Sequence, residues 1–156
     1  MKTTDDISDW DENTWLERVA GGISLRSVEN IEIYNCHIEN ISLGISIEYM
    51  SDYSKIVGNT IQNYSLDGAR LISNNVLFAY NTIKGCIKID DNHDDAIQSY
   101  SRGDNNSPGT GVLYNNVVRG NLIIGINGPD QPLAGTPQGI GCFDGFLMVG
   151  LWKIML

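Results

Sequence analysis

The stretch VGNTI at residues 57–61 recurs in altered form at three other places in the chain. The related stretches are YNCHI at 34–38, AYNTI at 79–83 and YNNVV at 114–118. Aligning them places four residues in one column: Cys36, Asn59, Asn81 and Asn116. Two positions later stand the apolar residues Ile38, Ile61, Ile83 and Val118. A repeat of about 22 residues that is rich in β-branched residues predicts parallel strands wound in stacked coils.

A second recurring pattern marks another side of each coil. It begins at residues 22, 44, 68, 95 and 139, with the sequences GISL, GISI, GARL, DAIQ and GIGC. We therefore predict a solenoid of about five coils over residues 21–146. The growing distance between these starts places extra length in loops at 90–94, 101–111 and 126–138. Such long loops are where a rigid scaffold usually carries its function.

Strand residues of the repeat should alternate between the inside and the outside of the coil. We expect Ile31, Ile33, Ile45 and Ile47 to point inward, and Glu32 and Ser46 to face outward. The asparagines of the first column are suited to bends, because their amides can satisfy backbone groups that a turning chain leaves unpaired. Stacked coils would arrange them as a ladder, which Cys36 interrupts.

Composition and charge restrict the class of protein. The chain has 156 residues, of which 42% are hydrophobic, which is enough for one domain with a core. Its net charge of −9 argues against nucleic acid or an anionic membrane as partner. Three cysteines without CxxC spacing indicate neither a disulfide framework nor a zinc site. The acidic first ten residues do not resemble a secretory signal peptide.

Both ends of the chain depart from the repeat. In residues 1–20, Ser8 and Asp9 followed by Trp10, Trp15 and Val19 predict an N-capped short helix that covers the first coil. Residues 147–156 are almost wholly apolar and are too short for a membrane-spanning helix, which needs about 20 residues. This tail is interpreted either as a final strand covered by a partner or as the truncated or out-of-frame end of a longer solenoid.

The repeats resemble the right-handed, single-stranded parallel β-helix of the pectate-lyase-like superfamily, which includes polysaccharide lyases, pectin-type glycosidases and phage tailspikes. The segments NHDDAIQS at 92–99 and QGIGCFDG at 138–145 are similar to those of uncharacterised bacterial and phage β-helix proteins. The resemblance implies an all-β fold and a carbohydrate partner, whereas the activity varies within the superfamily. The Asp94-Asp95 pair is only a fragment of the polygalacturonase pattern.

The densest polar cluster lies just before the fourth copy of the second pattern. It consists of Asp90, Asp91, His93, Asp94 and Asp95. Carboxylates this close repel one another unless water, a cation or protonation relieves the repulsion. Asp90, Asp91 and Asp94 are therefore candidate ligands for calcium, which binds several oxygen atoms at once. The alternative is a solvated acidic loop or an aspartate turn.

Stacking would bring residues of this cluster together with residues from other coils. The candidate catalytic residues are His93, Asp94, Asp95, Arg70 and Asp144. The candidate substrate-binding residues are Gln98, Tyr100, Arg102 and Lys88. In a lyase, Arg70, Lys88 or His93 would act as the base beside a neutralised uronate carboxylate. In a glycosidase, two carboxyl groups such as Asp95 and Asp144 would act together.

These observations lead to two expected functions. The first is binding and cleavage of an acidic polysaccharide by lyase or hydrolase chemistry. The second is a non-enzymatic adhesion or tailspike-like stem, which would be a homotrimer or part of a longer β-helix. Both favour an extracellular or virion-associated location, with no nucleic acid and no membrane as partner.

Overall fold

Three parallel sheets form the body of the protein in the computed structural model, which describes residues 6–125, 131–142 and 144–148. The first sheet contains, in spatial order, β1 (Ile23–Arg26), β4 (Ile45–Glu48), β7 (Asp67–Leu71), β10 (Asp95–Ser99) and β14 (Ile140–Cys142). The second contains β2 (Glu32–Tyr34), β5 (Lys55–Val57), β8 (Leu77–Ala79) and β12 (Val117–Arg119). The third contains β3 (His37–Ile41), β6 (Thr60–Tyr64), β9 (Thr82–Cys86) and β13 (Leu122–Ile124).

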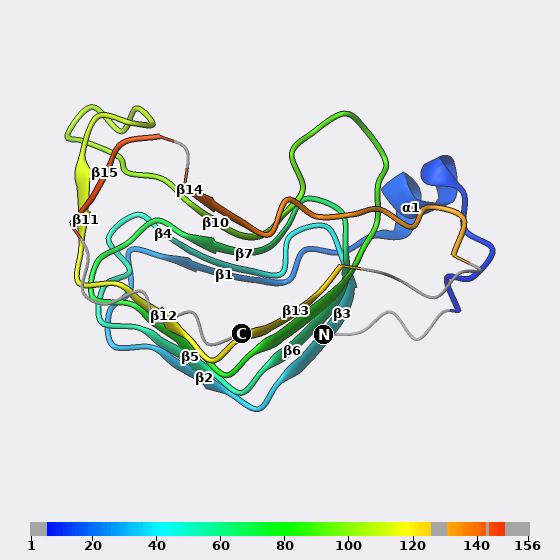
Figure 1. The fold of residues 1–156 in the computed structure, drawn as a ribbon, viewed down its shortest axis with the longest axis horizontal. Coiled ribbons are helices and arrows are strands. Elements are labelled where there is room, and N and C mark those ends of the chain that lie inside the picture. Colours follow the sequence, from blue (N-terminus) through cyan, green and yellow to red (C-terminus); the bar gives the residue numbers. More distant parts are fainter. Residues whose placement is uncertain (1–5, 126–130, 143, 149–156) are drawn as a thin grey trace.

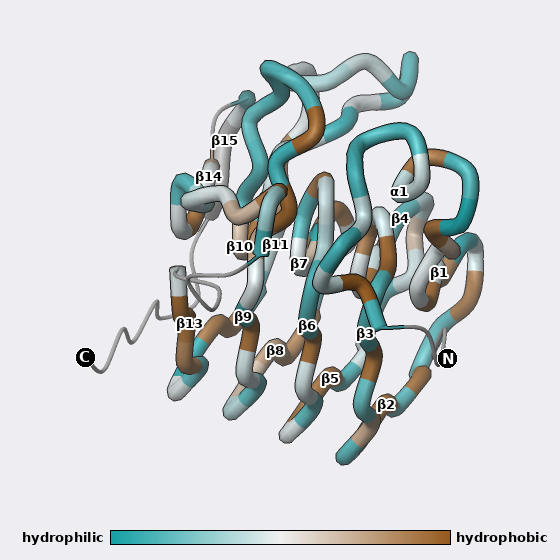
Figure 2. Tube along the Cα trace, turned by 90° about the vertical axis from the view of Figure 1, so that its right-hand side faces the viewer, coloured by the Kyte–Doolittle hydropathy of each residue, from teal (hydrophilic) through white to brown (hydrophobic). Residues whose placement is uncertain are grey.

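The chain visits these sheets in the same order each time, so neighbours in a sheet are three apart in strand order up to β10 and four apart after β11 is inserted (Figure 1). Figure 2 shows the successive passes side by side, with hydrophobic residues recurring on each. A further parallel pair joins β11 (Val112–Tyr114) to β15 (Phe146–Met148). The predicted all-β architecture of stacked parallel strands is confirmed, and it is compatible with a β-helix. Of the predicted loop 126–138 and tail 147–156, residues 126–130 and 149–156 lie outside the described part.

An interior row of isoleucines fixes the register of the third sheet. Ile38 pairs with Ile61 and Ile61 with Ile83, as the repeat predicts, and all three are buried. The fourth member was predicted wrongly, because Ile83 pairs with Ile123 whereas Val118 pairs with Phe78 in the second sheet. The cause is the greater length of that coil, which contains loop 100–111. Val118 is still buried, but in the neighbouring row.

The first sheet departs from the predicted alignment by a single residue. Ile45 pairs with Ala69 and Ala69 with Ile97, so Asp95 lies opposite Asp67 rather than opposite Gly68. Since successive side chains of a strand point to opposite faces, a shift of one residue exchanges the buried and outer faces. The observed register is the one that points Ile97 into the core beside Ala69.

At the bend between the second and third sheets, asparagine side chains accept hydrogen bonds from backbone amides of the neighbouring coil. Asn59 Oδ1 accepts from Cys36 N (2.9 Å), Asn81 Oδ1 from Asn59 N (2.9 Å) and Asn121 Oδ1 from Asn81 N (2.8 Å). The predicted ladder is therefore present. It is interrupted at Cys36 in the first coil, as predicted, but in the last coil its member is Asn121 and not Asn116. Asn116 serves another bend, where its Oδ1 accepts from Val76 N (2.9 Å).

The N-terminal segment forms helix α1 (Glu12–Arg18), which begins after Asp11. Asp11 Oδ1 accepts from Thr14 N (2.8 Å), so the N-cap lies two residues later than Asp9. Trp15 is fully buried, donates through Nε1 to Ser65 Oγ (2.9 Å), and packs with Ile87. These contacts tie the helix to turns of later coils. The helix is too short to cross a lipid bilayer, and the described part of the chain has no longer apolar helix that could.

Replacing Asn81 tests the contribution of the ladder to stability. Asn81 Nδ2 donates to Ile56 O (3.0 Å) in addition to the bonds given above, and the side chain is buried. We expect Asn81→Ala to lower the free energy of unfolding by about 3 kcal/mol, since each buried group left without a partner costs roughly 1–3 kcal/mol. Chemical unfolding followed by circular dichroism measures the change. Asn13→Ala, on the exposed face of α1, is the control and should change stability by no more than about 0.5 kcal/mol.

Candidate functional site

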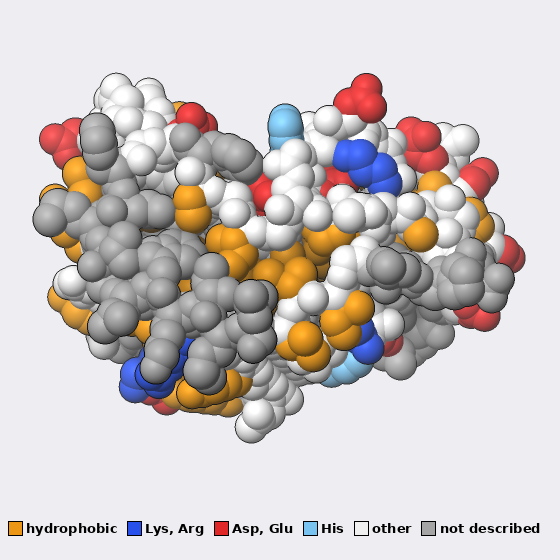
Figure 3. Space-filling model, viewed as in Figure 1, with side chains coloured by type: hydrophobic (Ala, Val, Ile, Leu, Met, Phe, Trp, Pro, Cys, Tyr) orange, Lys and Arg blue, Asp and Glu red, His pale blue; other side chains and the backbone are white. Residues whose placement is uncertain are grey.

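Two loops rise from the first sheet at the two ends of β10. In Figure 1, residues 87–94 (green) lead into β10 and residues 100–111 (yellow-green) follow it. The space-filling view shows the surface dipping between the two raised regions, with histidine, basic and acidic side chains gathered near the loop that precedes β10 (Figure 3). Both loops belong to the coil in which the sequence predicted added length. The candidate site lies on the outer face of the sheet between them.

A cavity of about 250 Å³ lies beside the loop that precedes β10. It is lined by Leu66, Asp67, Arg70, Asn92, His93 and Gln98. Arg70 Nη2 donates to Asp67 Oδ2 (2.5 Å) and Arg70 Nε to the same oxygen (3.0 Å). Burial raises the pKa of Asp67, while the charge of Arg70 opposes this effect. The cavity therefore combines a buried carboxyl group with a guanidinium group that holds it in place.

Asp95 adjoins Asp67 on the next strand. Its side chain is 0% exposed, its backbone N donates to Asp67 Oδ1 (3.2 Å), and its Oδ2 accepts from Gln98 Nε2 (3.4 Å). The other carboxyl oxygen, Oδ1, is buried and has no hydrogen-bond partner. Burial is the largest effect on the pKa of Asp95 and raises it. A carboxyl group in such surroundings favours its protonated form.

Asp94 faces away from this pair, toward Lys88. Lys88 Nζ lies 3.1 Å from Asp94 Oδ2, and Cys86 Sγ donates to the same oxygen (3.8 Å). Burial raises the pKa of Asp94, and the ammonium group of Lys88 opposes the shift. Lys88 also donates to Asn92 O. Asp94 and Lys88 therefore form an internal support for the loop that carries His93.

The predicted calcium ligands do not converge. Asp90 and Asp91 are exposed, and Asp90 accepts from Asn92 N (2.9 Å) and Asn92 Nδ2 (2.8 Å), an aspartate turn. Within residues 6–125, 131–142 and 144–148, no three His, Cys, Asp or Glu side chains form a group that could hold a metal ion. Asp90, Asp91 and Asp94 as a calcium set therefore remain a prediction from the sequence.

His93 joins the loop before β10 to the segment before β14. Gln138 Nε2 donates to His93 Nδ1 (2.6 Å), and Gln138 N donates to Asp94 O (2.9 Å). Lys88 N likewise donates to Leu133 O (2.8 Å). These bonds fix the position of His93 at the margin of the cavity, although the two segments are about 45 residues apart in sequence.

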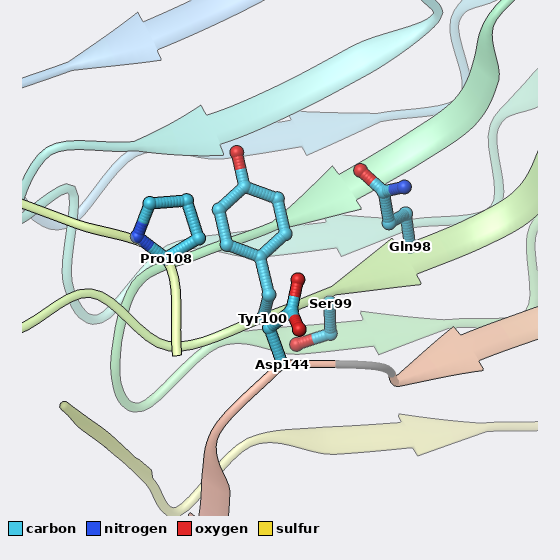
Figure 4. Close-up of a pocket in the computed structure, with 5 residues that line it drawn as sticks. All are labelled: Gln98, Ser99, Tyr100, Pro108 and Asp144. Atoms are coloured by element: carbon cyan, nitrogen blue, oxygen red, sulfur yellow. The ribbon is translucent and has the colours of Figure 1, made fainter. Parts of the chain in front are cut away.

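Asp144 lies in a separate, smaller pocket of about 130 Å³. The pocket is lined by Gln98, Ser99, Tyr100, Pro108 and Asp144. Figure 4 shows the rings of Tyr100 and Pro108 side by side, with the carboxylate of Asp144 near the base of Tyr100 and Gln98 further along β10. Gln98 lines both this pocket and the larger cavity, so the two spaces adjoin. Asp95 does not line this pocket, and its partner on the neighbouring strand is Asp67, so the pairing of Asp95 with Asp144 stays a prediction from the sequence.

Glu48 is a site residue that sequence reasoning missed. It is buried on β4, where Ser46 Oγ donates to its Oε1 (2.5 Å). Glu48 Oε2 lies 3.7 Å from Arg26 Nη2, and its Oε1 lies 4.0 Å from Arg70 Nη1. Ser46, predicted to face outward, is consequently covered rather than exposed. The strand register, which places Glu48 beside Arg26, was the available signal.

The pH dependence of stability tests the environment of Asp95. Because burial raises its pKa in the folded state, the folded protein binds more protons than the unfolded protein at pH values above the ordinary 3.8. Stability should therefore fall as pH rises from 3.8 through the folded-state pKa. Asp95→Asn should reduce this fall and leave the variant at least as stable as the wild type at neutral pH. Thermal unfolding over this range measures the effect, and exposed Asp91→Asn is the control; an unchanged pH profile in Asp95→Asn would contradict the assignment.

Comparison with known proteins adds no external assignment to this geometry. No family model matches the chain, and no curated protein and no solved structure matches it. The function is therefore inferred from the residues of the site and their surroundings.

Proposed function

We propose that this protein binds an acidic polysaccharide on the outer face of the first sheet and cleaves it by hydrolysis. The observation that carries the proposal is the pair of buried carboxyl groups, Asp67 and Asp95, which lie opposite each other on neighbouring strands; Asp67 lines the cavity and Asp95 adjoins Asp67. Burial raises the pKa of both groups. Glycoside hydrolysis commonly uses two carboxyl groups, of which one donates a proton and the other carries charge.

The surroundings of the two carboxyl groups favour different roles. Asp67 is bound by Arg70, which opposes the effect of burial on its pKa and supports the charged form. Asp95 has only the weaker bond from Gln98 at one oxygen and no partner at the other. Asp95 is therefore the proposed proton donor and Asp67 the proposed charged partner. Such a division between two neighbouring carboxyl groups is how one site performs acid and base chemistry.

A cationic group at the cavity supports an acidic substrate. Arg70 lines the cavity together with His93, and Lys88 stands on the loop that carries His93. A uronate carboxylate is a suitable partner for a guanidinium group, which can bind both carboxylate oxygens. Gln98 connects this cavity to the pocket that contains Tyr100, which suits a substrate longer than one sugar unit. No step of the proposed reaction requires calcium.

The finer assignment of the fold forms part of the same proposal. We assign the stacked sheets to a right-handed parallel β-helix of the pectate-lyase-like kind. The recurrence of three strands in constant order supports it, as does the general rule that connections between parallel strands are right-handed. This fold is compatible with several chemistries, so the choice of hydrolysis depends on the carboxyl pair alone.

Cleavage of defined polysaccharides tests the proposed function. Wild-type protein, Asp95→Asn and Asp67→Asn are incubated with polygalacturonate, alginate and hyaluronan, and new reducing ends are measured. We expect each substitution to lower the rate by at least about 100-fold, the scale of general acid–base catalysis. Asp91→Asn, in the exposed part of the acidic loop, should keep the wild-type rate. Circular dichroism confirms that each variant is folded.

Three other results would contradict different parts of this proposal: hydrolysis, catalysis itself, or the independence from calcium. Products with ultraviolet absorbance from unsaturated uronides would indicate a lyase, with His93, Arg70 or Lys88 as candidate base. Retention on immobilised polysaccharide without any product would indicate the non-enzymatic adhesion protein. Loss of activity on chelation, with recovery on adding calcium, would show that the metal is required.

A further inference from the structure

A second groove, larger than the carboxyl cavity, lies beyond the C-terminal ends of the first-sheet strands. Its volume is about 520 Å³. Its main polar and large side chains are Tyr49, Met50, Asp52, Asn74, Arg102 and Asp104. These come from the turns that follow β4 and β7 and from loop 100–111. A groove of this size falls within the range of small-molecule sites in proteins.

The turn after β4 holds two large residues in a strained backbone conformation. Tyr49 has a φ of 52° and Met50 a φ of 60°, in the left-handed region that bulky side chains rarely adopt. Met50 is 73% exposed, so burial of its side chain does not explain the conformation. Strain of this kind costs of order 1–3 kcal/mol per residue and tends to occur at ligand sites. The strain presents Tyr49 and Met50 to the groove.

Arg102 is held rigidly at the wall of the groove. Its guanidinium lies over the rings of Tyr49 and Tyr100, at 5.4 Å and 5.2 Å from the ring centroids. Nη2 donates to Tyr100 Oη (2.8 Å) and Nη1 to Asn106 Oδ1 (3.2 Å). Its Nε is buried and has no hydrogen-bond partner. Such fixation lowers the entropy that is lost when a ligand binds.

Loop 100–111 that carries Arg102 is itself tightly bonded. Arg102 and Pro108 form an antiparallel bridge, Asn106 N donates to Gly103 O (2.7 Å), and Gly103 N donates to Thr110 Oγ1 (3.0 Å). A Cβ atom on Gly103 would come within 2.6 Å of Thr110 O, so the two sides of the loop pack too closely there for any side chain. The wall of the groove is therefore preformed.

The charges of the groove do not favour an anion. One arginine, Arg102, stands against the two aspartates Asp52 and Asp104. Asp52 Oδ1 accepts from Asn74 N (2.9 Å), which fixes its carboxylate at the groove. Hydrogen-bond donors and acceptors thus alternate with the apolar surfaces of Met50 and Val112. A neutral molecule rich in hydroxyl groups, which both donate and accept hydrogen bonds, matches this lining.

We propose that this groove binds an uncharged sugar unit of the same polysaccharide whose acidic unit lies in the carboxyl cavity. This inference rests on the proposed function and specifies its substrate as a mixed polymer of acidic and neutral sugars. The pocket of Figure 4 shares or contacts residues of both spaces. Gln98 lines the pocket and the cavity, and Tyr100 of the pocket is bonded to Arg102 of the groove.

Binding measurements on a non-cleaving protein test this inference. All proteins carry Asp95→Asn, and the probes are oligosaccharides of hyaluronan, gellan and xanthan, which contain neutral units, and oligogalacturonate and oligoalginate, which are wholly acidic. We expect at least one mixed oligosaccharide to bind more tightly than both acidic ones in calorimetric titration. Adding Arg102→Met or Tyr49→Ala should weaken this binding by about tenfold or more, as loss of hydrogen bonds and ring contacts predicts.

Tyr53→Ala is the matched control. Tyr53 is also a tyrosine in the left-handed region (φ 59°) and is 54% exposed, but it does not line the groove. Its replacement should leave binding unchanged. Stronger binding of the wholly acidic probes, equal affinity in the groove variants, or no binding of any probe would overturn the inference. Binding that depends on Arg102 and Tyr49 in a protein without hydrolytic activity would instead reject the proposed hydrolysis alone.

Discussion

The structure depends on hydrogen bonds to the backbone groups at the points where the chain bends from one sheet to the next. Within the strands, the backbone of each coil is hydrogen-bonded to the backbone of the next coil. At the bends, backbone carbonyl and amide groups turn away from this sheet pattern and need other partners. The side chains of Asn59, Asn81 and Asn121 replace the missing partners between the second and third sheets. These bonds join successive coils directly before the strands that carry Ile38, Ile61 and Ile83.

The sequence predicted the stacked strands because the repeat encodes them twice, through apolar residues that fill the interior and asparagines that serve the bends. The alignment of the repeat is wrong in the coil with long loops, because it predicts Asn116 as the next member of the asparagine ladder. Asn116 does the same chemical work at another bend, toward Val76, so its residue type could not reveal the difference. The pairing of Ile83 with Ile123 and the bond from Asn81 N to Asn121 Oδ1 distinguish the two bends.

The candidate site was predictable to the extent that it lies on strands. Arg70, Asp95 and Gln98 occupy neighbouring strands as the second pattern implies, and the shift of one residue then brings Asp67 opposite Asp95. The direction of Asp94 toward Lys88 and the separate pocket of Asp144 depend on loops, whose sequences do not repeat. The contact of Trp15 with Ser65 likewise joins a segment outside the repeat to a distant turn.

Both long loops belong to the coil that lies between Asn81 and Asn121 in sequence, and yet the bond between these two residues (2.8 Å) is no longer than the bond of the shorter coil between Asn59 and Asn81 (2.9 Å). The height of one step of the stack is therefore independent of the number of residues that the step contains. Such a scaffold can acquire new surface in evolution by lengthening a single turn, without a compensating change in its neighbours. The residues that bind a ligand and the residues that stabilise the fold can then change at different rates within one small domain.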